Sequence, residues 1–206
     1  MSLTQDQISS SLDALAAREP RIAEVLEVAG YPEPRVRETG YRTLLRTIVG
    51  QQVSVAAAAS VWRKLEAELG EEMDAKELLA RDFDALRACG LSRQKQGYAR
   101  SLCELVVSEE LDLGALPADD EDAIAELIRI KGIGRWSAEI YLLFAEGRPD
   151  IWPAGDLAVQ KAVGKIMQLG EKLPPEKEVR AIAEDWKPHR GAMAIFAWHT
   201  YNMEAI

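Results

Sequence analysis

The chain has 206 residues, of which 48% are hydrophobic and 29% are charged, a composition typical of a folded globular protein. Its net charge of −9 excludes a generally basic nucleic-acid binder, so any such surface has to be local. The two cysteines, Cys89 and Cys103, cannot form a disulfide framework or a four-cysteine cluster. No apolar run approaches the roughly 18 residues of a membrane span. Because the first residues also lack the pattern of a signal peptide, we expect a cytoplasmic protein with no membrane partner.

Apolar residues recur at helical spacing along most of the chain, and no stretch alternates with the period of a strand. Ser54 and Ser92 are typical of helix N-caps, and Gly70 is typical of a helix end. We therefore predict an all-α fold, a two-lobed helical bundle. Its predicted helices cover 5–17, 20–29, 40–50, 54–69, 92–109, a segment after Pro117, 135–146, 156–168, 176–185 and 190–203.

The segment GRPDIWPAG, residues 147–155, interrupts the helical pattern with two prolines and two glycines. We place the break between lobes there, which divides the chain into 1–40, 41–146 and 147–206. The N-terminal helices in 1–40 are expected to pack with the C-terminal lobe.

The segment 124–141, IAELIRIKGIGRWSAEIY, predicts two helices joined by a very tight turn. The first helix would bury Ile124, Leu127, Ile128 and Ile130. Both turn glycines are expected at positive φ, with Ile133 filling the gap between the helices. The amides of Gly132, Ile133 and Gly134 would bind a phosphate of the DNA backbone, surrounded by Arg129, Lys131 and Arg135. The alternative is an ordinary helix–helix turn with a glycine C-cap.

Three separated motifs resemble the helix-hairpin-helix (HhH-GPD) DNA glycosylase superfamily. The first is the hairpin followed by Pro153-Ala154-Gly155-Asp156. The others, Ile48-Val49-Gly50-Gln51-Gln52-Val53-Ser54 and Trp186-Lys187-Pro188-His189-Arg190, resemble the alkylated-base branch, the 3-methyladenine DNA glycosylase II type. The resemblance spans roughly residues 40–200 and implies base excision repair of double-stranded DNA by a monomeric, nucleoid-associated enzyme.

Departures from the family pattern refine this expectation. Trp136 stands where bifunctional members carry a lysine, and a tryptophan cannot form a Schiff base, so we expect no lyase activity. The four C-terminal cysteines of iron–sulfur members are missing. Ile140 replaces a second pocket aromatic, which leaves the breadth of substrates open. Too few residues precede Tyr41 for the β-rich domain of the best-known bacterial relatives.

The resemblance implies that Asp156 is the catalytic residue. Cleavage of an N-glycosidic bond builds positive charge on the sugar, which a carboxylate stabilises. From local sequence alone, an N-cap is the more common role of such an aspartate, and the two roles are compatible.

The target nucleotide has to leave the stack and enter a pocket. The aromatic candidates for that pocket are Trp136, Trp198, Tyr141 and Tyr41, although such rings are also typical of a core, as we expect of Trp62 and Trp186. The resemblance implies that Gln52 is the wedge that fills the vacated space; the alternative is a solvated helix end.

We expect no organic cofactor and no metal site, while a monovalent cation at the hairpin is compatible with the family. The predicted function is a monofunctional glycosylase that releases alkylated purines such as 3-methyladenine and leaves an abasic site. The alternatives are a non-catalytic helix-hairpin-helix DNA-binding protein and a glycosylase for another damaged base.

Overall fold

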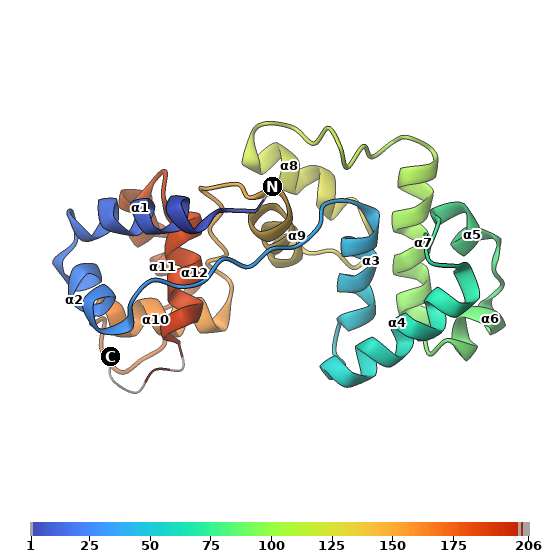
Figure 1. Cartoon of the computed structure of the whole chain (residues 1–206), viewed down its shortest axis with the longest axis horizontal. Helices are drawn as coiled ribbons and strands as arrows, with labels where there is room; N and C mark the ends of the chain where they lie inside the picture. Colours follow the sequence, from blue (N-terminus) through green and yellow to red (C-terminus); the bar gives the residue numbers. More distant parts are fainter. Residues whose placement is uncertain (1, 202, 204–206) are drawn as a thin grey trace. The chain divides into compact units, whose positions relative to one another are not determined.

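The computed structural model describes residues 2–201 and 203, and these form helices and loops without strands (Figure 1). Contacts divide the chain into two units, one made of 1–37 and 142–206 and the other of 38–141. The second boundary lies between Tyr141 and Leu142, ahead of the 147–155 loop where the sequence placed it. No helix among the described residues is long and apolar enough to cross a bilayer.

The first unit gathers both ends of the chain. Its helical elements are α1 (Gln5–Ala16), α2 (Pro20–Ala29), the π-helical turn η1 (Leu142–Glu146), α10 (Leu157–Ile166), α11 (Glu176–Ile182), the 3₁₀ turn η2 (Ala183–Trp186) and α12 (Arg190–Thr200). Helix α12 packs against α1 and α10, and α2 also contacts α10. Trp186 is buried, as predicted, and packs edge-on against Trp152. The predicted end of the last helix at 203 includes residue 202, which lies outside the described residues.

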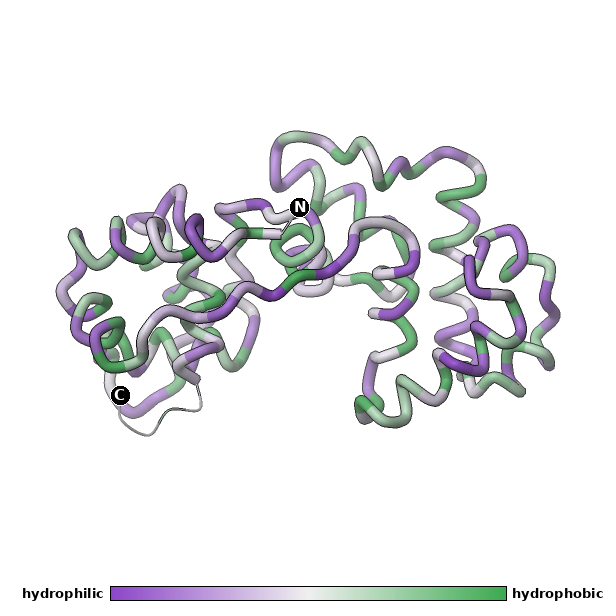
Figure 2. The backbone as a smooth tube through the Cα atoms, viewed as in Figure 1, coloured by the Kyte–Doolittle hydropathy of each residue, from purple (hydrophilic) through white to green (hydrophobic). Residues whose placement is uncertain are grey.

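The second unit is continuous in sequence. It contains α3 (Tyr41–Gly50), α4 (Val55–Leu69), α5 (Ala75–Ala80), α6 (Phe83–Ala88), α7 (Arg93–Val107), α8 (Asp120–Ile128) and α9 (Arg135–Tyr141). Helix α7 contacts α3, α5 and α6. Ser54 and Ser92 cap α4 and α7 as predicted, and Gly70 ends α4 at a φ of +84°. Figure 2 shows hydrophilic and hydrophobic residues alternating along these helices, as amphipathic packing requires.

Three expectations about these elements were wrong. Helices α5 and α6 were not predicted. The predicted helix 135–146 is α-helical only to Tyr141 and continues as the π-helical turn. Ile128, expected on the buried face of α8, is 48% exposed, because the helix ends at this residue and the chain turns into the hairpin.

Candidate functional site

The hairpin between α8 and α9 is built around one constrained glycine. Gly132 has a φ of +84°, whereas Gly134 is not at positive φ, which corrects the expectation for both glycines. A Cβ atom at Gly132 would overlap the ring of Tyr98 on α7. Ile133 fills the gap between the helices as predicted, with only 4% of its surface exposed. The turn therefore depends on Gly132, while Gly134 faces open space.

The backbone amides of the hairpin are not all available to a ligand. The Ile133 N–H donates to the Ile130 carbonyl at 3.0 Å, and the Lys131 N–H donates to the Ser101 hydroxyl at 3.1 Å. The Ile133 amide, which was predicted to donate a hydrogen bond to a phosphate, is therefore already used within the protein. Within the described residues, the Gly132 and Gly134 amides have no protein acceptor.

Acidic partners neutralise two of the three predicted cations. Arg129 pairs with Glu110 and with Glu126, at 3.3 and 2.5 Å. Arg135 pairs with Glu121 and with Glu139, at 2.5 and 2.9 Å. Hydrogen bonding to Glu121 is the main reason that the pKa of Arg135 is raised. Only Lys131 lacks a carboxylate partner among the described residues, so the expected basic cluster is reduced to one unpaired cation.

The loop between α3 and α4 is fastened to the hairpin. The Gln51 side-chain amide donates to the Gly132 carbonyl at 2.8 Å. The Lys95 ammonium donates to the Val49 carbonyl at 2.7 Å and so holds the end of α3. Directly after these anchored residues, the exposed Gln52 has a φ of +55°. Gln52, the residue expected to act as the wedge, therefore lies on a loop that is held in place. The sequence analysis missed that Gln51 fastens this loop to the hairpin.

Asp156 begins α10 as its N-cap. Its Oδ1 atom accepts hydrogen bonds from the Ala158 and Val159 amides, at 2.8 and 3.0 Å. The same atom accepts a third hydrogen bond from the indole Nε1 of Trp198 on α12, at 3.1 Å. The structure therefore brings together two predicted site residues, and one carboxylate oxygen is fixed by three N–H donors.

The predicted pocket aromatics occupy different surroundings. Trp198 lies 5.4 Å from the ring of Phe144, a neighbour that the sequence analysis had not singled out. Trp136 is 48% exposed at the start of α9. Tyr141 is 2% exposed, and its hydroxyl accepts a hydrogen bond from the Gly40 amide at 2.7 Å. The Tyr41 hydroxyl contacts the buried Cys103 thiol at 3.3 Å, and burial is the main cause of its raised pKa. Tyr141 thus fills an interior position, and Tyr41 is half-buried.

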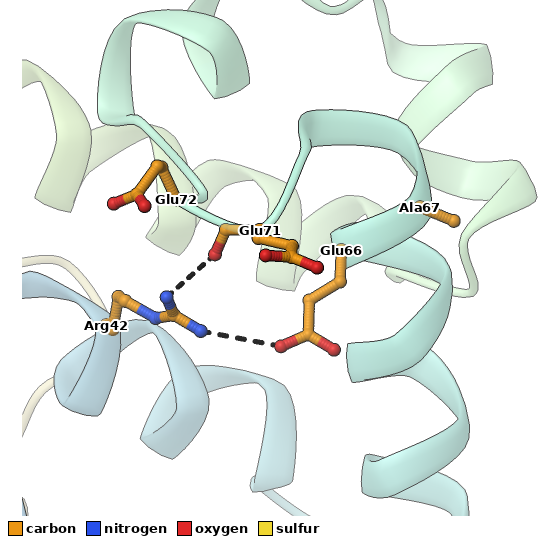
Figure 3. A pocket seen from close by; sticks show the side chains of 5 residues that line it. All are labelled: Arg42, Glu66, Ala67, Glu71 and Glu72. Carbon is orange, nitrogen blue, oxygen red and sulfur yellow. Dashed lines mark hydrogen bonds and ion pairs between the residues drawn. The ribbon is translucent and has the colours of Figure 1, made fainter.

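A separate surface depression lies on the second unit. It is lined by Arg42, Glu66, Ala67, Glu71 and Glu72. Figure 3 shows the Arg42 guanidinium directed at the Glu66 carboxylate and the Glu71 carbonyl, at 3.4 and 2.7 Å. Three glutamates with a single, already paired arginine give this depression an acidic character, which does not suit a phosphate group.

Comparisons with known proteins identify the family of the chain. A DNA-3-methyladenine glycosylase of Schizosaccharomyces pombe is 31% identical over 172 residues, covering 79% of this chain and 73% of the relative. A putative DNA-3-methyladenine glycosylase of Bacillus subtilis is 29% identical, and the match covers 78% of this chain but only 58% of that protein. The solved structure of S. pombe 3-methyladenine DNA glycosylase in complex with abasic DNA has a TM-score of 0.80 at 27% identity, covering 95% of this chain and 98% of that one. Residues 45–189 match the HhH-GPD superfamily of base excision DNA repair proteins, and the chain belongs to that family.

Proposed function

We propose that the protein is a monofunctional DNA glycosylase that hydrolyses the N-glycosidic bond of alkylated purines such as 3-methyladenine and leaves an abasic site. The observation that carries this proposal is the Asp156 carboxylate, one oxygen of which accepts hydrogen bonds from Ala158, Val159 and Trp198 in a family of base excision repair proteins. The names of the relatives supply the substrate class.

The chemistry follows from charge. As the bond to the base breaks, the sugar becomes positively charged, and a fixed carboxylate stabilises that charge without having to reorganise. The hydrogen bonds to Asp156 Oδ1 supply the fixed position. The base leaves with the bonding electron pair. Water then adds to the sugar carbon and gives up one proton to the Asp156 carboxylate, which leaves a hydroxyl on the abasic sugar. We assign the faces of Trp198 and Trp136 to base stacking, and Gln52 to the space that the flipped nucleotide leaves.

The DNA backbone would be bound by the Gly132 and Gly134 amides and by Lys131. These contacts to the DNA backbone do not depend on the base sequence. A protein that searches DNA for rare damaged bases needs such sequence-independent binding. The proposal includes no organic cofactor. A monovalent cation at the hairpin stays a prediction; the Gly132 carbonyl there already accepts a hydrogen bond from Gln51.

Replacement of Asp156 by asparagine tests the catalytic assignment. Asparagine is as good an N-cap as aspartate, so the fold and the DNA affinity should be retained. The single-turnover rate of 3-methyladenine release should fall on the order of 100-fold or more, because the charge is lost.

Asp119 provides the matched control. It caps α8 in the same way, accepting hydrogen bonds from the Glu121 and Asp122 amides at 2.9 and 3.1 Å. Asp119→Asn should release base at the wild-type rate. Equal rates for Asp156→Asn and Asp119→Asn would remove Asp156 from the chemistry. A wild-type protein that binds duplexes but releases no base would favour the non-catalytic DNA-binding alternative. Release of other modified bases only, from a panel of single-lesion duplexes, would favour the other specificity.

The nature of the product is a second test. Trp136 has no amine to attack the sugar, so the reaction should end at an intact abasic site. Incubation with lesion DNA and borohydride should trap no covalent complex, whereas a lyase-proficient glycosylase in parallel should. A trapped adduct would show that another amine of this chain performs lyase chemistry.

A further inference from the structure

The extended segment 30–40, which joins α2 to α3, carries two arginines beside the Asp156 site. The Arg37 backbone N–H donates to the Phe144 carbonyl at 3.2 Å and to the Ser2 hydroxyl at 3.3 Å. These bonds fasten the backbone of the segment to η1. The side chains of Arg35 and Arg37 therefore project from a fixed point of the first unit.

Both guanidinium groups lie over aromatic rings of that site. The Arg35 Cζ atom is 6.0 Å from the ring centroids of Phe144 and of Trp198. The Arg37 Cζ atom is 5.7 Å from the Phe144 centroid. Since the indole of Trp198 donates to Asp156, a chain of direct contacts links Arg35 to the proposed catalytic carboxylate.

The two arginines differ from those of the hairpin in having no acidic partner. Within the described residues, no carboxylate pairs with either side chain, whereas Arg129, Arg135 and Arg190 each have at least one. Two like charges are thus held close to each other. Burial, and next the charge of Arg35, lower the pKa of Arg37. A bound anion would relieve this repulsion.

We propose that Arg35 and Arg37 bind a phosphate group of the DNA backbone next to the nucleotide on which Asp156 acts. The proposal rests on the proposed glycosylase function and adds a second site of backbone binding, on the unit that carries Asp156. A phosphodiester is the ligand that two adjacent guanidinium groups suit best, because each can donate two parallel hydrogen bonds to its oxygens. A cationic alkylated base is a poor ligand for the same groups, because like charges repel.

The test is the salt dependence of binding to a duplex that contains a tetrahydrofuran abasic analogue, which cannot be cleaved. For each phosphate that a variant no longer neutralises, the slope of log affinity against log salt should fall by about 0.9. Because the two arginines share one phosphate, we expect the full reduction of about 0.9 for the double variant Arg35→Gln/Arg37→Gln, and a part of it for each single variant. Arg35→Lys should keep most of the slope, because the charge remains. The Arg37 backbone bonds do not depend on its side chain, so the segment should stay in place.

Arg18→Gln is the matched control. Arg18 is an exposed arginine of the same unit, and among the residues that the structure describes its guanidinium donates to the Ala14 carbonyl alone, so the variant removes the same charge elsewhere. Slopes for Arg35→Gln and Arg37→Gln equal to that of Arg18→Gln would overturn the proposal. The binding assay measures affinity without cleavage, so it tests the phosphate site alone. Whether the protein is a glycosylase is decided separately, by base release from wild-type protein. Unchanged slopes with faster release of cationic bases would assign the arginines to base discrimination instead.

Discussion

At the scale of single residues, Asp156 shows how one atom performs two tasks. Its Oδ1 atom satisfies two amides at the start of α10, which explains why local sequence predicts an N-cap. The same atom accepts the indole N–H of Trp198, a residue far along the chain. The resemblance placed both residues in the site, but their direct bond could not be predicted, because it depends on how α12 packs against α10.

The bond between Trp198 and Asp156 should contribute to catalysis. Trp198→Phe keeps an aromatic ring for stacking but removes the donor, so the carboxylate is oriented by one hydrogen bond fewer. We expect the single-turnover rate of base release to fall on the order of tenfold, since the missing hydrogen bond is one to a charged group. The affinity for abasic-analogue DNA should change little.

Trp62 offers a matched control for this experiment. Its indole Nε1 donates to the Glu66 carboxylate at 2.6 Å, so Trp62→Phe removes the same kind of bond in the second unit. Base release by Trp62→Phe should match the wild type once folding is verified. If the two variants lost rate equally, the effect would be one of general stability, and Trp198 would have no positioning role.

The burial of the Cys103 thiol should make the protein less stable in alkali. Burial raises the pKa of Cys103 from 9.0 to about 11. The protonated thiol is therefore favoured in the folded state, and its contribution is complete below pH 9. It should be lost as the pH rises towards 11, which amounts to about 2 kcal/mol of unfolding free energy. Urea denaturation of wild type and Cys103→Ala between pH 7 and pH 10.5 measures this loss. The wild-type curve should fall more steeply above pH 9, and parallel curves would contradict the assignment.

At the scale of elements, the hairpin shows two glycines with unequal roles. Gly132 combines a φ of +84° with close packing against Tyr98, and both features exclude a side chain. Gly134 has neither constraint, and its carbonyl accepts the first hydrogen bond of α9, from Ala138 at 3.0 Å.

Substitution of each glycine by alanine tests whether Gly132 is constrained and Gly134 is not. Gly132→Ala should destabilise the protein by about 1 kcal/mol or more, because the backbone conformation is strained and the ring of Tyr98 has to move. Gly134→Ala should change the unfolding free energy by no more than about 0.5 kcal/mol. Thermal or urea denaturation of both variants gives the comparison. A Gly134→Ala protein destabilised as much as Gly132→Ala would show that the turn needs freedom at both positions.

Sequence periodicity predicted the longer helices because each carries several turns of an apolar stripe. It missed α5 and α6, which have six residues each and therefore too few turns for a period to emerge. Their caps were the available signal, since Asp74 and Asp82 accept hydrogen bonds from the Lys76 and Ala85 amides. The ion pairs of the hairpin arginines were also only partly predictable. Glu126 and Glu139 lie within one helical turn of Arg129 and Arg135, so the sequence could have predicted these two pairs. The pairs with Glu110 and Glu121 could not be predicted, because only folding brings these distant residues close to the arginines.

At the scale of the whole molecule, the acidic composition and the ion pairs of the hairpin both weaken the electrostatic attraction to DNA. With a net charge of −9, the protein repels DNA in general. Paired arginines at the hairpin limit the attraction further, so the proposed binding of DNA would depend on backbone amides and a few unpaired cations. Such a protein should bind DNA with modest salt dependence and move readily between sites, which suits a search for rare lesions.

The last prediction concerns this salt dependence. If Lys131 neutralises one phosphate at the hairpin, and Arg35 and Arg37 together neutralise another, the wild-type slope of log affinity against log salt should be near two. Lys131→Gln should reduce the slope by about 0.9, on duplexes with and without the lesion alike, because the hairpin reads no base. Arg129→Gln should reduce it far less, since Glu110 and Glu126 already neutralise that guanidinium. Equal reductions in the two variants would mean that DNA displaces the glutamates and recruits Arg129. A wild-type slope near eight would mean that many more cations reach the backbone than the unpaired ones identified in the structure.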